Sequence, residues 1–523
     1  MKLLIALTLC CFLNIINAQK NISFLGNLQY SEKINDIWGY SDNLGNEYAL
    51  VGSTTGTSIV NVTNPNLPEA LFFIPGDTSI WRDLKTYNNF AYVTNEESGG
   101  LLIIDLNNLP NNIDFQYWKV DTLGFETAHN IFIDENGIAY LFGSNIKNQG
   151  ALMLDLNVAN KYEPPLIGIY DDRYVHDGFV RDNVMWTAEV FDGDFSVVDI
   201  TNKQNPIVLA RQKTSSSFTH QCWLSDDNNY LITNDERSGA YIDIYDVSDL
   251  NNIKLLDKYR SSPDDSLIPH NNFFIGNDYF FTSYYRDGIT LVDATKKDNI
   301  VEVGNYDTSP FSAADGFEGC WGVYPYLPSG NILASDREEG LFILKPEFTR
   351  ACYLEGDIRD TTTNSPLKGI RVEIMGTDYI KESNFDGSYR TGVPDSGVYD
   401  IRFSRPFCKT VIVSGVTLLE AQVFDLDIET NCDFPLEIQS TEDKSLVHIS
   451  PNPFNENLKM SFKSAEKLQK ITVTNINGSL IKEIVINEYK GEVNFINNWK
   501  SGIYFLKCQF ESFSRVEKIQ KIN

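Results

Sequence analysis

A repeat with a period of 44 to 50 residues constrains the fold of this chain more than any other feature. Seven strand-like segments lie between Gly56 and Pro346, each just after a glycine and all but the last with an acidic or amide residue toward its end: GTSIVNVTNP, GGLLIIDLNN, GALMLDLNV, GDFSVVDITNKQNP, GAYIDIYDVSD, DGITLVDATKKDN and EGLFILKP. A second element accompanies them, in which a polar residue introduces another strand. Its alignment puts seven residues at one register: Asn35, Arg82, His129, His176, His220, His270 and Glu318.

Short strands separated by turns, without helical periodicity, give about four strands in a unit of this length. Seven units therefore predict a seven-bladed β-propeller over residues 20–346. The last unit ends after three strands, and the segment Ile22–Leu28 has the pattern of the fourth strands elsewhere. We expect this segment to complete the last blade, so that the ring closes without a free edge.

Two shorter segments of alternating strands and turns follow the repeat. Residues 351–432 contain an Asp-Gly turn, and residues 445–523 contain an Asn-Gly turn, which is typical of hairpins. The chain is therefore predicted to be all-β, with a seven-bladed β-propeller followed by two small β-sandwich domains.

The N-terminus has the layout of a secretory signal peptide over residues 1–18. One lysine precedes an apolar stretch, and we expect cleavage between Ala18 and Gln19. Beyond it, no apolar run reaches the roughly 18 residues that a transmembrane segment needs. Three of the six remaining cysteines lie from Cys352 to Cys432. An exported protein can form a disulfide there, and its partners stay unassigned.

The charge of the chain excludes one class of partner. Lys and Arg total 43 against 71 Asp and Glu, which gives a formal net charge of −28. A chain this acidic is not suited to neutralise phosphates, so nucleic acid is not an expected partner. At 42% hydrophobic residues, it is also too apolar for a disordered acidic polymer.

The last 79 residues, 445–523, resemble the type A C-terminal sorting domain of the type IX secretion system of Bacteroidetes. The resemblance rests on Pro-Asn-Pro at 451–453, the Asn-Gly hairpin, Gly-Ile-Tyr at 502–504 and a lysine-rich last strand. It implies engagement with the type IX secretion machinery and export through the periplasm. The protein would then be secreted or held at the outer cell surface, after removal of this domain.

Two further resemblances concern the rest of the chain. The segments SIVNVTNP, LLIIDL and SVVDITNKQNP resemble LVIVD repeats, and residues 22–346 look like the propeller of the choice-of-anchor B family. Residues 352–430 resemble the carboxypeptidase regulatory-like, transthyretin-like domain in the strands at 356–360 and 366–374. Such domains are spacers or binding modules, and neither resemblance supplies catalytic residues.

Four of the five histidines share the register of the repeat: His129, His176, His220 and His270. In a propeller the innermost strands line the central channel, so these rings would gather at one mouth. With Glu318 across the ring, they offer donors that Zn²⁺ and other late first-row divalent ions prefer. The alternative is that the histidines are structural and hydrogen-bond a neighbouring carboxylate such as Asp177. Both interpretations stay open.

Aromatic residues lie close to the same register. Trp38, Trp223 and Trp321 follow it by three residues in our alignment, and Trp81 precedes it. With Asn35 and Arg82 they form a candidate ligand-binding face; the alternative is packing between blades. Acidic loops offer oxygen ligands for Ca²⁺, but they lack the spacing of a calcium loop and are expected to be solvated turns: 95–100, 191–195, 234–239 and 336–340.

Common enzyme signatures are absent from the sequence: there is no G-x-S-x-G, no H-E-x-x-H and no phosphate-binding glycine loop. We therefore expect an extracellular binding module for a protein or a glycan rather than an enzyme. The alternative is a metal-dependent hydrolase at the histidine-lined channel mouth. The cofactor is left open, with a divalent metal, Zn or Ca, as the candidate.

Overall fold

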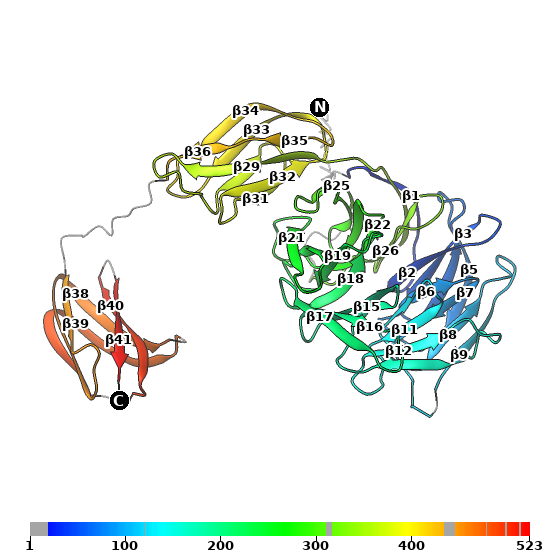
Figure 1. Ribbon diagram of the computed structural model, residues 1–523, viewed down its shortest axis with the longest axis horizontal. Coiled ribbons are helices and arrows are strands. Elements are labelled where there is room, and N and C mark those ends of the chain that lie inside the picture. Colours follow the sequence, from blue (N-terminus) through cyan, green and yellow to red (C-terminus); the bar gives the residue numbers. More distant parts are fainter. Residues whose placement is uncertain are drawn as a thin grey trace, which may run out of the picture. The chain divides into compact units, whose positions relative to one another are not determined.

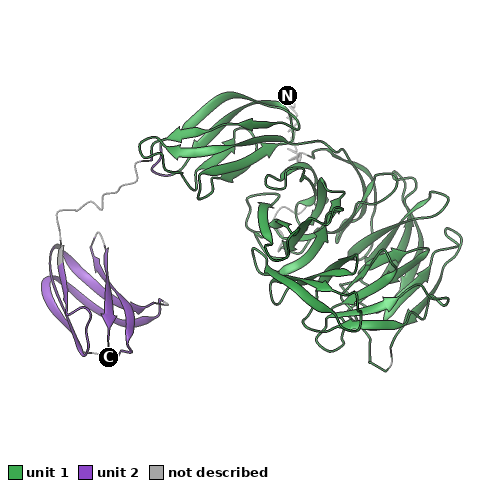
Figure 2. Cartoon of the chain, viewed as in Figure 1, with its two compact units in different colours: residues 1–405, 409–431 green, residues 406–408, 432–523 purple. Residues whose placement is uncertain are grey.

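The computed structural model describes residues 19–120, 122–309, 316–432, 445–476, 478–496, 499–511 and 514–522. The expected cleavage point falls at Ala18, which lies outside the described residues. All regular elements of the described chain are β-strands, so the fold is all-β as predicted (Figure 1). The chain divides into two compact units, residues up to 405 with 409–431, and residues 406–408 with 432–523 (Figure 2).

Seven four-stranded antiparallel sheets make up most of the first unit. The strands of the first three sheets are β2 (Ile34–Ser41), β3 (Glu47–Ser53), β4 (Gly56–Asn61) and β5 (Glu69–Pro75); β6 (Leu84–Tyr87), β7 (Phe90–Val93), β8 (Leu101–Asp105) and β9 (Asp114–Trp118); and β10 (Asn130–Ile133), β11 (Ile138–Phe142), β12 (Ala151–Asp155) and β13 (Leu166–Tyr170).

The next three sheets have the same strand order. Their strands are β14 (Asp177–Arg181), β15 (Val184–Glu189), β16 (Asp194–Asp199) and β17 (Ile207–Lys213); β18 (Thr219–Leu224), β19 (Tyr230–Asp235), β20 (Ile242–Asp246) and β21 (Lys254–Tyr259); and β22 (Pro269–Ile275), β23 (Tyr279–Tyr284), β24 (Gly288–Asp293) and β25 (Val301–Tyr306).

The seventh sheet joins the two ends of this region. Its strands are β26 (Cys320–Tyr324), β27 (Ile332–Asp336), β28 (Gly340–Pro346) and β1 (Ile22–Leu28). β1 runs antiparallel to β28, from Ile22 opposite Pro346 to Leu28 opposite Leu341. This is the partner expected for that strand, and it covers the edge that β28 would otherwise expose.

The first strands of the sheets lie next to one another. β2 neighbours β6, each later first strand neighbours the next, and β26 neighbours β2 again. We call this closed set of sheets the seven-sheet ring. Its first strands bring aromatic rings together 4.7 to 6.3 Å apart in a cluster that we call the aromatic plug: Trp38, Phe132, Phe179, Trp223, Phe273, Tyr324 and Tyr326.

Two further sheets, built from residues 352–430, face each other through the rings of Tyr389 and Phe403, whose centroids are 5.5 Å apart. One has the order β31 (Ile380–Glu382), β30 (Arg371–Ile374), β33 (Gly397–Ser404) and β34 (Val411–Leu418). The other contains β32 (Ser388–Val393), β29 (Cys352–Asp360), β35 (Val423–Asp425) and β36 (Ile428–Thr430).

The alternating strands and turns of residues 351–432 predict an antiparallel sandwich, and the structure differs from that prediction. β35 and β36 both run parallel to β29, because the chain returns to the first sheet only after β33 and β34 have been added to the second. A disulfide joins Cys408 to Cys432, and Cys352 is a free, buried thiol. The structure thus supplies the pairing that the sequence left unassigned.

The second unit is a five-stranded sheet curled around its own core. Its strands are β37 (Ser445–Ser450), β38 (Asn457–Asn475), β39 (Leu480–Ile496), β40 (Gly502–Phe510) and β41 (Ser514–Lys521). Phe462, Ile471 and Leu506 are buried in that core. The unit therefore has an apolar core independent of the seven-sheet ring.

Candidate metal centre

Register shifts occur at the start of four first strands, β2, β18, β22 and β26. In β18 the pairing register shifts between Thr219 and Gln221, and in β22 it shifts between Pro269 and Asn271. A bulge breaks the alternation of side chains along a strand. His220 and His270 are therefore turned toward the neighbouring first strands, on the same side as the aromatic residues three positions later.

The four predicted histidines form a continuous row of rings. Ring centroids are 3.9 Å apart for His129 and His176, 4.6 Å for His176 and His220, and 4.4 Å for His220 and His270. Trp321 continues the row, with its ring 4.6 Å from that of His270. We call these five side chains the histidine row.

Glu318 does not belong to this row. β26 contains a register shift between Cys320 and Gly322, so that Trp321 occupies the position of His270 in the preceding sheet. Glu318 lies before β26 and is half-buried. The alignment of the repeat places the register three residues too early in this sheet, because it matches Cys320-Trp321 to Cys222-Trp223, whereas Cys320 has the ladder position of Thr219.

A cavity of about 20 Å³ lies against the histidine row. A volume of this size holds about one water molecule or one small ion. Its lining combines the histidine row with other residues at or beside the same register: Asp36, Trp81, Arg82, Asp83, His129, Asn130, His176, Asp177, His220, His270, Asn271 and Trp321.

Three buried aspartates lie beside this cavity, together with one lysine. Lys85 Nζ is 2.7 Å from Asp83 Oδ1 and 4.3 Å from the ring centroid of Trp38. Burial and the charge of Asp83 raise the pKa of Asp36 well above its ordinary value. The same two causes raise the pKa of Asp177 to about 7. Lys85 therefore interacts with three carboxyl groups, and protonation of Asp36 and Asp177 lowers the negative charge among them.

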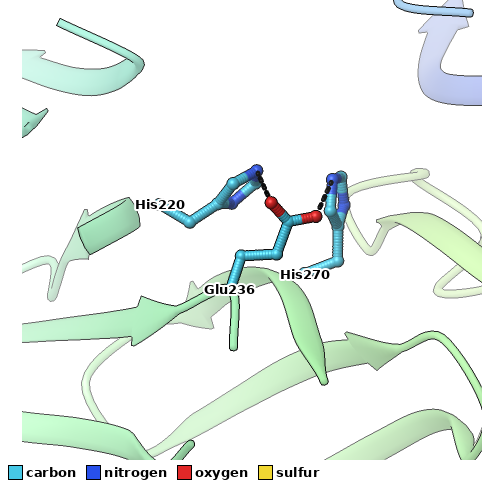
Figure 3. Close-up of side chains that lie close together, drawn as sticks. All are labelled: His220, Glu236 and His270. Carbon is cyan, nitrogen blue, oxygen red and sulfur yellow. Dashed lines mark ion pairs between the residues drawn. The ribbon is translucent and has the colours of Figure 1, made fainter. Parts of the chain in front are cut away.

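Two glutamates from loops face the histidine row. Glu96 Oε1 is 2.5 Å from His129 Nδ1, which is a direct hydrogen bond. Glu236 follows β19, and its two carboxylate oxygens lie 4.0 Å from His220 Nε2 and 3.9 Å from His270 Nε2 (Figure 3). Glu236, His220 and His270 offer ligand atoms that all lie within 4.8 Å of one another.

Neither glutamate was selected from the sequence. Both lie in the acidic loops that were expected to be solvated turns, at residues 95–100 and 234–239. Each follows an asparagine closely at the end of a second strand, in the segments Asn95-Glu96 and Asn234-Asp235-Glu236. This shared position after a second strand is the sequence signal that could have indicated Glu96 and Glu236. The length of the loops alone does not distinguish a solvated turn from a loop that folds over the channel.

Burial controls the charge of this cluster. It lowers the pKa of His220 to about 3, and together with the charge of His220 it lowers that of His270 well below the ordinary value. Burial raises the pKa of Glu236 to about 7, although Tyr285 donates a hydrogen bond of 2.7 Å to Oε1. His220 and His270 are consequently neutral near pH 7, which is the form of imidazole that binds a metal.

The tryptophans of the candidate ligand-binding face divide into two groups. Trp38 and Trp223 belong to the aromatic plug, which corresponds to the packing alternative. Trp81 and Trp321 line the small cavity. Asn35 lies in the irregular start of β2, where its buried Oδ1 has no hydrogen-bond partner.

A larger cavity of about 420 Å³ lies between the first and second sheets. Arg82 lines it as well as the small cavity, with Nε donating a hydrogen bond of 2.8 Å to the carbonyl of Ser53. The remaining lining is mixed: Gly56, Thr57, Ile74, Pro75, Gly76, Asp77, Val93, Asn95, Ser98, Gly99, Leu102 and Tyr117. The volume falls within the usual range of small-molecule sites.

Comparison with known proteins places one part of the chain. No curated protein matches it. None of the described residues forms a helix long and apolar enough to cross a membrane. Residues 448–522 match the family model described as the secretion system C-terminal sorting domain. This C-terminal part is therefore a type IX sorting domain, which engages that secretion machinery and indicates export to the medium or the outer surface of a Bacteroidetes cell.

Proposed function

We propose that the seven-sheet ring is a seven-bladed β-propeller of the LVIVD-repeat, choice-of-anchor B type. Four-stranded sheets in series, first strands that neighbour one another, and a last sheet completed by β1 support this proposal. The proposed chain has a signal peptide at 1–18, the propeller at 20–346, a carboxypeptidase regulatory-like sandwich at 351–432 and the sorting domain at 445–523.

We further propose that the exported protein binds an extracellular saccharide in the larger cavity. The observation that carries this proposal is the 420 Å³ cavity with a mixed wall. The ring of Tyr117 offers an apolar face at its edge, and Tyr117 is 42% exposed. Asp77 and Arg82 supply charged groups, and the buried hydroxyl of Thr57 has no hydrogen-bond partner. A sugar ring presents an apolar face and several hydroxyls, which this wall can pair.

Binding to a glycan array, followed by calorimetric titration of the saccharides that bind, tests this function. Tyr117→Ala should weaken binding by about tenfold or more, because it removes the aromatic wall. Phe115→Ala is the matched control, since Phe115 lies on the same strand, is 44% exposed and is not part of the cavity lining. The proposal would be contradicted if Tyr117→Ala and Phe115→Ala bound the saccharide with equal affinity, or if the protein bound peptides and no saccharide.

The hydrolase alternative is not proposed. The matched family concerns secretion and supplies no observation in favour of hydrolysis.

A further inference from the structure

We propose that His220, His270 and Glu236 bind one late first-row divalent cation, such as Zn²⁺, between the fifth and sixth sheets of the seven-sheet ring. This site is separate from the saccharide cavity, and none of the three residues lines that cavity.

The distances leave room for an ion between the three side chains. Glu236 lies 3.9 and 4.0 Å from the two Nε2 atoms, which is too long for hydrogen bonds. Ligands of a tetrahedral Zn²⁺, each about 2.0–2.1 Å from the ion, are about 3.3 Å from one another. Since the three ligand atoms lie within 4.8 Å of one another, shifts of roughly half to one ångström in each side chain would bring them onto one cation.

The hydrogen bonds around His270 set its ring for this role. Nδ1 lies 2.6 Å from the carbonyl oxygen of Trp321, so Nδ1 carries the proton that it donates there. Nε2 is then an acceptor, and it faces Glu236 Oε1, which accepts a hydrogen bond from Tyr285. When Glu236 is ionised, two acceptors thus point at one another. A cation between them removes this conflict, and an Nδ1–H donated to a backbone carbonyl is the usual support of a metal-binding histidine.

The histidine row also contains a histidine–glutamate pair that leaves no room for an ion. His129 and Glu96 also pair a ring with a loop carboxylate, but their atoms are 2.5 Å apart and bond directly. His176 Nε2 is buried without a hydrogen-bond partner next to His220, and it can complete the ligand set or bind a water on the ion. The geometry therefore distinguishes a metal position in the fifth and sixth sheets from a hydrogen bond at His129.

The donor atoms select the class of cation. Two imidazole nitrogens and one carboxylate suit Zn²⁺, Co²⁺ or Ni²⁺, whereas Ca²⁺ and Mg²⁺ require oxygen ligands. We therefore do not assign Ca²⁺ to this site, although the acidic loops offer oxygen ligands of the kind that Ca²⁺ prefers.

The test uses the full chain without a histidine tag, stripped of metal with a chelator and titrated with Zn²⁺, Co²⁺ and Ca²⁺. We expect about one Zn²⁺ per chain, the visible absorption of Co²⁺ bound to imidazole, and no competition from Ca²⁺. Glu236→Gln should weaken Zn²⁺ binding at least tenfold. Glu96→Gln is the matched control and should change it less than twofold.

Three results would overturn the site: less than 0.2 Zn²⁺ retained per chain at about tenfold excess of metal, equal losses in the two variants, or displacement of Zn²⁺ by Ca²⁺. Thermal melts of both variants check that they are folded. If Glu236→Gln does not fold, the Co²⁺ spectrum of the unaltered chain decides, because a spectrum without imidazole coordination excludes His220 and His270. Saccharide binding by the metal-free chain is measured separately, so either proposal can fail alone.

Discussion

At the scale of the residue, the start of each first strand decides which side chain reaches the centre of the seven-sheet ring. His220, His270 and Trp321 all occupy shifted positions of their strands. Because residues three apart then share a side, these three rings lie on the same side of their strands as Trp223, Phe273 and Tyr324 of the aromatic plug. Trp321, at the shifted position of β26, is therefore a site residue, whereas Glu318, three residues earlier, lies outside the histidine row.

Burial of carboxyl groups also acts at this scale, and it makes stability depend on pH. Burial raises the pKa of Glu302 from 4.5 to about 7, while Tyr259 and Asn305 donate hydrogen bonds to it. Because the folded pKa is raised, the folded chain holds a proton that the unfolded chain releases above pH 4.5. This stabilisation is complete below the unfolded pKa and is lost as the pH rises through 7.

Glu302→Gln should therefore raise the free energy of unfolding by about 1–3 kcal/mol at pH 8 and change it little at pH 4.5. Glutamine resembles the protonated side chain and cannot ionise. Glu69→Gln, at an exposed position of β5, is the control and should have no such dependence. Chemical denaturation at the two pH values measures the difference, and an effect of the same size at both would contradict the assignment.

At the scale of the element, β1 is the strand that completes the seven-sheet ring. It adds backbone hydrogen bonds along β28, and Ile22 is 3% exposed within the main apolar cluster. Ser23, the next residue, is exposed. Substitutions at Ile22 and Ser23 can therefore distinguish the contribution of the buried face of β1 from that of its exposed face.

Ile22→Asp should lower the free energy of unfolding by about 3 kcal/mol or more, because it removes a buried apolar side chain and buries a charge. Ser23→Asp changes the exposed face of the same strand and should stay within about 0.5 kcal/mol. Urea denaturation followed by tryptophan fluorescence compares them. Equal midpoints for Ile22→Asp and the unaltered chain would show that β1 does not support the ring.

At the scale of the whole molecule, the sandwich is fixed to the seven-sheet ring by buried polar contacts. Asp293 accepts hydrogen bonds from the backbone of Ala351 and the hydroxyl of Tyr353, at 2.8 and 2.9 Å. Lys381 lies 3.3 Å from Asp257. Asp293 is fully buried, so these bonds are shielded from water and stabilise the contact more than surface ion pairs do. The first unit should therefore unfold as one body.

The sorting domain has its own core, so its removal should separate export from folding. A chain that ends at residue 440 should keep the melting temperature of the first unit but stay in the periplasm. Cell fractionation measures its location, and residues 441–523 fused to a periplasmic reporter provide the reciprocal control. Normal appearance of the shortened chain at the surface or in the medium would contradict a sorting role.

The sequence alone determined the strand-rich class, the number of repeats, the partner of Ile22–Leu28 and the sorting domain, because each depends on patterns within short segments. It also placed four histidines at one register. Only the tertiary structure decided that Glu236, rather than Glu318, faces His220 and His270, and that Cys408 pairs with Cys432. Those relations depend on bulges, loop paths and packing between separate sheets, and a period in the sequence carries no information on such distances.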